Sequence, residues 1–204
     1  LSPQELRQAL YPGKFINYVN GISSTCTELK RMLNIKKPDF RMRDVEILIR
    51  YFAFAVFAKD YSGSMQQFLD NTCNELNKVW DNRYTEIENL YEQFQMAARM
   101  TFNIFGKDAF HKFKAGNYEN KINRAVADIM LFYFSNPDIR MAVPGHEEQI
   151  KSRFEILSTG RAEFLSAIET TTKSIQSVKE RFNTWANALN EELGVKVESP
   201  YSEN

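Results

Sequence analysis

The chain has 204 residues, of which 43% are hydrophobic and 16 are phenylalanine, a composition that excludes an intrinsically disordered protein. Its eight glycines and six prolines are too few for an all-β protein with many tight turns, so we predict an all-α fold. The 26 basic and 26 acidic residues balance, which leaves no overall charge to attract nucleic acid or an anionic membrane.

The first predicted helix has a clear start signal. Ser2 suits the N-cap, Pro3 suits the first helical position, and Glu5 can reach back to the cap, as in a capping box. We predict that this helix covers residues 2–11. Two further short helices and a loop follow, at residues 15–19, 25–33 and 36–39.

A central pair of helices is predicted next. Residues 44–58 are apolar on nearly every side, as expected for a helix at the centre of a domain. From Ser64, which forms a second capping-box pattern with Gln67, apolar residues recur at helical spacing as far as Phe105. One helix of about 42 residues and ~60 Å, or two helices joined near residues 81–82, would give this pattern. We favour one long helix, with or without a kink.

The second half is also predicted to be helical. In chain order, the expected elements are helical turns at 108–113, a loop at 115–117, and helices at 120–134, 146–157, 161–168 and 175–193. The apolar spacing of the last helix is typical of a bundle seam. We therefore predict an elongated multi-helix bundle that forms a single domain over residues 1–198, with a frayed tail at 199–204.

The sequence offers little for catalysis. Its two histidines, His111 and His146, lie outside metal-ligand motifs, and there is no phosphate-binding glycine loop. Cys26 and Cys73 form no C-x-x-C pair, which suits a reducing cytosol and leaves no metal framework. No apolar run reaches the ~20 residues that a membrane span needs. We predict a cytoplasmic protein that contacts no membrane and that has no catalytic, metal or cofactor site in this chain.

One segment, residues 30–43, has an asymmetric charge. Its only acidic residue is Asp39, whereas its basic residues are Lys30, Arg31, Lys36, Lys37, Arg41 and Arg43. On a loop between helices, these side chains are candidates for contacts with nucleic-acid phosphates. The alternative, which we favour, is that Lys30 and Arg31 stabilise a helix C-terminus and that the others are solvated.

Four segments occur in an order and spacing that match a known family: LSPQELRQALYPGKF at 1–15, KKPDFRMRDVEILIRYFAF at 36–54, GSMQQFLD at 63–70 and FGKDAFHKF at 105–113. Together they resemble the helical half of the S-type component of GmrSD-like modification-dependent restriction systems. The first segment is the most specific, and the resemblance extends over residues 1–130. In that family, a ParB-like or sulfiredoxin-like domain with a D-G-Q-Q-R motif precedes this region.

The resemblance implies a bacterial anti-phage restriction protein that acts on modified DNA. Nucleotide binding and hydrolysis would belong to the preceding domain, and cleavage would belong to an HNH-type nuclease domain or subunit. The D-G-Q-Q-R motif does not occur in this sequence, so we interpret the chain as a fragment without that domain. It would support the nucleotide-binding domain and relay its state to the nuclease, with no enzyme activity of its own. The intact protein would then contribute to a nucleotide-dependent restriction endonuclease.

Glu5, Arg7, Arg41 and Asp44 match positions that the family signature keeps. By resemblance they are candidates for the junction with the preceding domain. In the alternative interpretation, which remains open, Glu5 and Asp44 cap helices and the arginines bridge helices. Two other functions also remain: a DNA-contacting module that uses residues 30–43, and a helical protein-protein interaction module. High salt would weaken the first kind of binding and spare the second.

Overall fold

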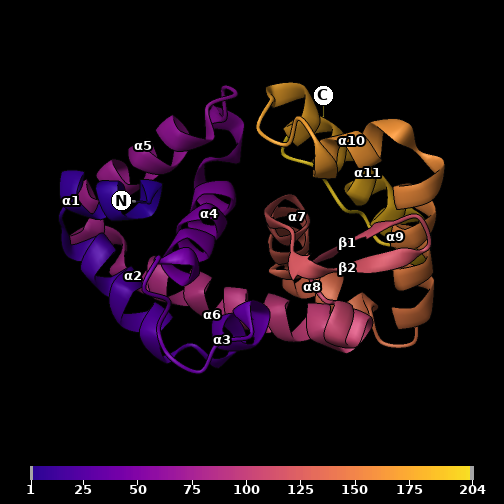
Figure 1. Cartoon of the computed structure of the whole chain (residues 1–204), viewed down its shortest axis with the longest axis horizontal. Coiled ribbons are helices and arrows are strands. Elements are labelled where there is room, and N and C mark those ends of the chain that lie inside the picture. The colour runs from indigo at the N-terminus through magenta and orange to yellow at the C-terminus, as the bar shows by residue number, and fades with distance from the viewer. Residues whose placement is uncertain (1, 203–204) are drawn as a thin grey trace. The chain divides into compact units, whose positions relative to one another are not determined.

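The computed structural model describes residues 2–202 and is mostly helical, with one small two-stranded sheet, which confirms the predicted all-α class (Figure 1). Its contacts group into two compact units, Leu1–Glu92 and Gln93–Asn204. The sequence pattern predicts one bundle over residues 1–198, whereas the contacts of the folded chain form two units that meet near its middle in sequence. Each unit has its own buried core.

Unit 1 is built around one central helix. Its elements are α1 (Pro3–Leu10), α2 (Lys14–Thr25), α3 (Thr27–Leu33), α4 (Arg43–Phe57), the short 3-10 helix η1 (Ala58–Asp60), α5 (Met65–Lys78) and the first half of α6 (Trp80–Phe105). α4 contacts α1, α2, α3 and α5. Its Phe52 is fully buried and meets the ring of Phe15 from α2 edge to face, with 5.3 Å between the ring centroids. The central position predicted for this apolar helix is thus confirmed.

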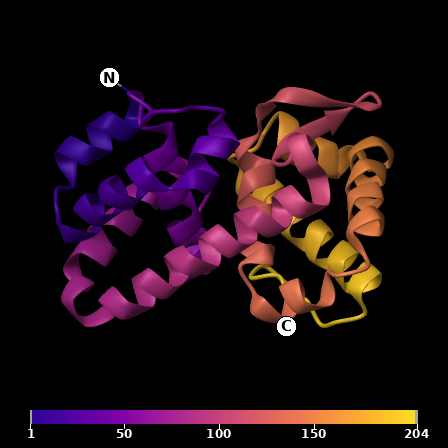
Figure 2. The same cartoon turned by 90° about the horizontal axis from the view of Figure 1, so that it is seen from below.

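The long helical stripe is divided between two helices. α5 ends at Lys78, and Val79 leaves the helical conformation with φ −97° and ψ 6°. α6 then runs for 26 residues in another direction (Figure 2). A long helix is therefore present, but the favoured single helix over residues 64–105 is wrong. Both helices bury an apolar face, so the periodicity continues across the break and cannot reveal it.

Unit 2 combines helices with a small hairpin. Its elements are the second half of α6, η2 (Gly106–Asp108), β1 (His111–Lys114), β2 (Asn117–Ile122), α7 (Arg124–Phe134), α8 (Pro137–Ala142), α9 (Glu147–Gly160), α10 (Ala162–Glu169) and α11 (Ile175–Leu193). α11 packs against α7, α9 and α10. Phe154, Phe182 and Trp185 are fully buried in this core.

The hairpin corrects two predictions, the helical turns at 108–113 and a helix from residue 120. Strands β1 and β2 pair antiparallel, with His111 opposite Ile122 and Lys114 opposite Asn117. Between them, Ala115 and Gly116 have φ values of 49° and 83°, and two positive φ angles are typical of the tight turn that joins such strands. α7 begins only at Arg124, where the Asn123 side chain accepts a hydrogen bond from the Val126 amide.

The chain after α11 packs on unit 2. Asn190 donates a hydrogen bond to the Val197 carbonyl (2.7 Å) and accepts one from the Val197 amide (2.6 Å). The ring of Tyr201 meets that of Phe182 edge to face at 5.4 Å. These contacts hold the start of the tail at 199–204, which is predicted to fray, and residues 203–204 lie outside the described residues. No described helix combines the length and the apolar composition that crossing a membrane requires.

Candidate functional site

The start of α1 is capped as the sequence predicts. The Glu5 amide donates a hydrogen bond to Ser2 Oγ at 3.2 Å, and the Ser2 amide donates one to the Glu5 carboxylate. These bonds from the backbone and side chain of Ser2 hold the pKa of Glu5 below its usual value. Glu5 therefore has a structural role in the capping box.

Arg7 points into unit 1. Its side chain is 2% exposed, and its Nε lies 2.6 Å from Asp70 Oδ1 on α5. Nη1 also donates a hydrogen bond to Gln4 Oε1 at 2.6 Å. The alternative in which this arginine bridges two helices is therefore the one that the geometry favours.

A residue that sequence reasoning missed explains the Tyr11-x-Gly13-x-Phe15 part of the first block. Asn77 on α5 donates a hydrogen bond to the Tyr11 carbonyl at 3.1 Å. Its Oδ1 accepts one from the Phe15 amide at 3.0 Å, at the start of α2. A Cβ atom at Gly13 would lie 2.2 Å from Asn77 Oδ1, so only glycine leaves room. Nothing local marks Asn77, because its partners lie more than 60 positions earlier in the chain.

Asp39 organises the second block. Its carboxylate accepts hydrogen bonds from the amides of Arg41 (3.2 Å) and Arg43 (3.3 Å), and it pairs with the Arg43 guanidinium. Burial raises the pKa of Asp39, but the Arg43 side chain and these amides outweigh it and lower the pKa. Asp44 is buried, and its Oδ2 accepts a hydrogen bond from the Asp39 amide (3.3 Å). The N-cap position of α4 is Met42, so Asp44 stabilises the loop from within the first turn of the helix.

The basic candidates occupy different settings. Lys30 and Arg31 lie in the last turn of α3, and Arg43 is paired with Asp39. We use the term basic loop for residues 34–42, which contain the exposed Lys36, Lys37 and Arg41. Within residues 2–202, Lys36 and Lys37 form no salt bridge. The other prominent side chain of this loop, which sequence reasoning missed, is Phe40, which is 80% exposed with the Arg41 guanidinium 5.4 Å from its ring centroid.

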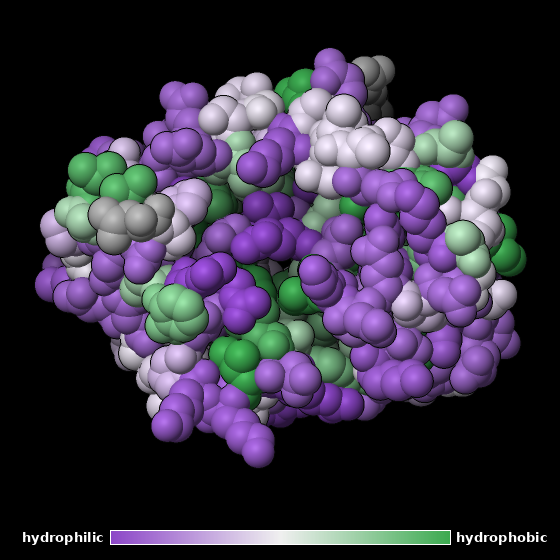
Figure 3. Space-filling model, viewed as in Figure 1, coloured by the Kyte–Doolittle hydropathy of each residue, from purple (hydrophilic) through white to green (hydrophobic). Residues whose placement is uncertain are grey.

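The structure brings the two sequence blocks together. Ser2 Oγ donates a hydrogen bond to the Arg41 carbonyl at 3.4 Å, and the charge of Arg41 is one of the causes that lower the pKa of Glu5. α1 also exposes Leu6 (45%) and Leu10 (69%). A hydrophobic area is visible over α1 in Figure 3.

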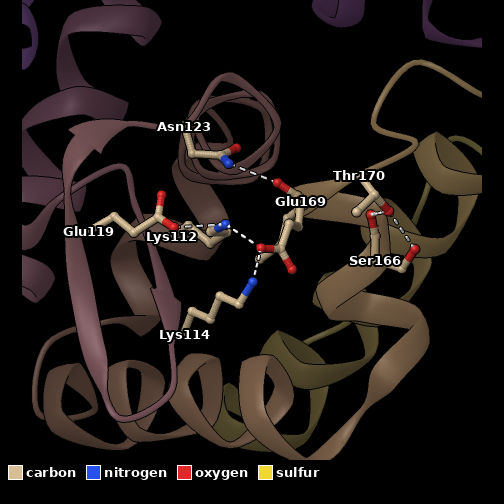
Figure 4. A network of polar contacts seen from close by, with 8 residues as sticks. Lys112, Lys114, Glu119, Asn123, Ser166, Glu169 and Thr170 are labelled. Atoms are coloured by element: carbon tan, nitrogen blue, oxygen red, sulfur yellow. Dashed lines mark hydrogen bonds and ion pairs between the residues drawn. The ribbon is translucent and has the colours of Figure 1, made fainter.

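Unit 2 contains a polar network that links the hairpin to α10 (Figure 4). Lys112 is 7% exposed, with its Nζ 2.8 Å from Glu119 Oε1 and 2.9 Å from Glu169 Oε1. Lys114 also pairs with Glu169, and Asn123 donates a hydrogen bond to the Ile168 carbonyl at 2.7 Å. Burial lowers the pKa of Lys112, but its bonds with both glutamates outweigh burial and raise it. A lysine held protonated in this way serves the structure and is a poor nucleophile.

The histidines and cysteines lie in separate structural settings. His111 is half-buried on β1, and His146 is at the N-cap of α9. Cys26 and Cys73 are buried, and burial raises the pKa of both thiols, that of Cys73 to about 12. In the described part of the chain, no group of three or more His, Cys, Asp and Glu residues is placed to hold a metal ion.

Comparisons of this chain with protein-family models, with curated proteins and with solved structures found no match.

Proposed function

We propose that this chain is a non-catalytic helical module of a GmrSD-like anti-phage restriction protein in the bacterial cytoplasm. In this role it supports a preceding ParB-like nucleotide-binding domain and relays the state of that domain to a nuclease partner. The proposal starts from the resemblance of the blocks at residues 1–15 and 36–54. Its main support is the contact between Ser2 Oγ and the Arg41 carbonyl (3.4 Å), which places both blocks side by side.

Some residues of the two blocks are buried and stabilise the fold, whereas others are exposed and available to a partner. Arg7 and Asp44 are buried and hold α1 and the basic loop in place. Leu6, Leu10 and Phe40 are exposed apolar side chains on the same two segments. Exposed apolar side chains next to a rigid polar framework are typical of a surface that packs against another protein domain. We therefore place the proposed junction at these three residues, with Arg41 beside them.

The proposal can be tested in the intact restriction protein by the double substitution Leu10→Ser and Phe40→Ser. Because both side chains are exposed, we expect the melting temperature of the helical part to stay nearly constant while protection against phage plaques is lost. Met141→Ser, at a methionine of unit 2 that is 73% exposed, is the matched control and should keep protection. Full protection by the double variant would contradict the proposed junction.

A second candidate function is contact with DNA through the basic loop. The observation that favours it is that this loop combines three exposed cations, Lys36, Lys37 and Arg41, with the exposed ring of Phe40, whose centroid lies 5.4 Å from the Arg41 guanidinium. Cations of this kind bind phosphates, and an exposed aromatic ring can stack on an unpaired base.

Fluorescence anisotropy with labelled single-stranded and double-stranded DNA tests this candidate. The triple variant Lys36→Gln, Lys37→Gln and Arg41→Gln should bind more weakly, and each lost phosphate contact should reduce the salt slope on duplex DNA by about 0.9. A control variant with Gln at Lys107, Lys179 and Lys196 changes the net charge equally, at exposed positions elsewhere. Equal loss in both variants would indicate a general charge effect and would exclude a site at the basic loop.

A further inference from the structure

A pocket opens at the surface of unit 1, beside the end of α4 and along α5. Its volume is about 390 Å³, within the range of roughly 300–1,000 Å³ that small-molecule sites occupy. The lining residues come from the segment between the end of α4 and the third turn of α5, and they are Phe57, Asp60, Phe68, Asn71, Thr72 and Glu75. None of them is part of the surface discussed above.

The apolar wall of the pocket is held rigidly. The Phe68 ring packs against Phe54 at 5.2 Å and, edge to face, against Tyr61 at 5.1 Å. The Thr72 hydroxyl donates a hydrogen bond to the Phe68 carbonyl at 2.8 Å, which fixes its side chain on the same wall. Binding of a ligand in this pocket therefore carries little entropic cost from ordering the side chains of this wall.

The polar groups of the pocket carry one uncompensated negative charge. Of its two carboxylates, Glu75 is paired with Lys78, whose Nζ lies 2.7 Å away. Asp60 makes no hydrogen bond or salt bridge from its side chain within residues 2–202, and the same holds for the carboxamide of Asn71. Lys59 is adjacent to Asp60 in the chain but does not line the pocket. A free carboxylate and a free amide oxygen beside phenyl rings match a cation that has an apolar stem.

We propose that this pocket binds a monovalent organic cation, an alkylammonium or guanidinium group, with the charge at Asp60 and the stem between Phe57 and Phe68. Aromatic rings attract such cations through their π faces, and a carboxylate adds a charge-assisted hydrogen bond. An anion would meet two carboxylates, and the described residues offer no three-ligand group for a metal ion. The shared chemistry fits a lysine or arginine side chain of a partner protein as well as a free amine. This inference is independent of the proposed function.

The test is a titration of the full ¹⁵N-labelled chain, followed by amide chemical shifts in NMR spectra. The probes are pentylammonium and the neutral analogue pentanol, at constant ionic strength. We expect pentylammonium to shift the Asn71 side-chain resonances and the amides around Asp60 in a saturable way, whereas pentanol leaves them in place. Asp60→Asn should weaken pentylammonium binding about tenfold or more. The control Asp138→Asn, at an exposed carboxylate of unit 2, should have no effect.

Two further measurements make the outcome decisive. Phe57→Ala should also weaken binding, and an unchanged melting temperature of each variant shows that the fold is kept. A blocked peptide with a single lysine shows whether the bound cation belongs to a protein or to a small molecule. Tighter binding of the peptide indicates a protein partner, and tighter binding of pentylammonium indicates a free amine. Equal shifts with pentanol, or unchanged affinity in Asp60→Asn, would overturn the proposal.

Discussion

Arg7 and Asp70 form an ion pair between α1 and α5, in which 2% of the arginine side chain and 17% of the aspartate side chain are exposed. Removal of one partner of a buried pair leaves the other charge poorly solvated, at a typical cost of about 3–5 kcal/mol. Since Asp70 keeps some exposure, we expect Arg7→Ala to lower the free energy of unfolding by about 2–4 kcal/mol in urea denaturation. By resemblance Arg7 is a candidate for the domain junction, and the contact with Asp70 adds a structural role within unit 1.

The matched control for Arg7→Ala is Lys78→Ala. Lys78 pairs with Glu75 on the surface of α5, where the two side chains are 59% and 49% exposed. Exposed pairs of this kind contribute about 0–1 kcal/mol, so the control variant should unfold at nearly the wild-type urea concentration. Similar small losses in both variants would show that the Arg7 pair is energetically equivalent to a surface pair.

His111 should make the stability depend on pH. Burial lowers the pKa of its imidazole and outweighs the charge of Asp108, which acts to raise it. The unfolded chain therefore binds more protons than the folded protein as the pH falls below the ordinary histidine value of about 6.5. The contribution of His111 to stability is complete above that pH and is lost as the pH falls through the lower, folded-state pKa.

Replacing His111 by glutamine removes this titration. We expect the wild-type protein to lose more unfolding free energy between about pH 7.5 and pH 5.5 than His111→Gln does, as measured by urea denaturation at both pH values. The other histidine, His146, provides the control variant His146→Gln. The same pH dependence in the wild type and in His111→Gln would contradict the assignment.

At the scale of elements, the junction of α1 and α2 depends on a close approach of α5. Gly13 has extended backbone angles (φ 172°), so its importance comes from space and not from backbone strain. A methyl group there would displace Asn77 and break its hydrogen bonds with the Tyr11 carbonyl and the Phe15 amide. We expect Gly13→Ala to lower the melting temperature, with a loss of about 1–3 kcal/mol from the unpaired backbone groups.

Gly21 provides the matched control for this substitution. It lies inside α2, and a Cβ atom there would meet nothing within 4 Å. Alanine is the better helix former by about 1 kcal/mol, so Gly21→Ala should keep or raise the melting temperature. The expected changes in melting temperature of the two glycine variants therefore have opposite signs. A lower melting temperature in both variants would refute the role given to Asn77.

The turn of the hairpin should respond to changes in its two central residues. Ala115 adopts φ 49° and Gly116 adopts φ 83°, and a left-handed conformation costs a non-glycine residue about 1–2 kcal/mol. Asn-Gly is the preferred pair for such a turn. We expect Ala115→Asn to raise the unfolding free energy by about 0.5–1 kcal/mol and Gly116→Ala to lower it by about 1 kcal/mol. Calorimetry of both variants checks the prediction, which fails if the two changes have the same sign.

Element prediction succeeded where the signal was local and failed where a distant contact decides. The capping box of Ser2 and Glu5 and the apolar surface of α4 can both be read from neighbouring residues. The two strands of the hairpin are joined by a turn of Ala115 and Gly116 in place of the common Asn-Gly, and Lys112 on β1 is buried because two glutamates pair with it. Neither feature is marked in the local sequence, so the pattern predicts helical segments on both sides of the loop at 115–117, where the structure has strands.

The properties of the basic loop and of the proposed junction could be predicted only in part from the sequence. The segment rich in basic residues was identified from composition, but the pairing of Arg43 with Asp39 and the exposure of Phe40 depend on how the loop folds. The same is true of Arg7, since its partner Asp70 lies on another helix. Charge in a sequence locates such a segment, and tertiary contacts then decide which of its charges remain available to a partner.

The last expectation is that the purified chain hydrolyses neither ATP, GTP nor DNA in the presence of Mg²⁺. Phosphoryl transfer needs metal ions and cations positioned around the phosphates. The sequence lacks a phosphate-binding glycine loop, and residues 2–202 hold no group of three or more potential metal-binding side chains. Release of phosphate and cleavage of plasmid DNA are the two measurements, and contamination is the main hazard. An activity that survives in every carboxylate variant of the chain belongs to a contaminant, whereas one that is lost on substitution of a single carboxylate, with the fold unchanged, would refute the non-catalytic role.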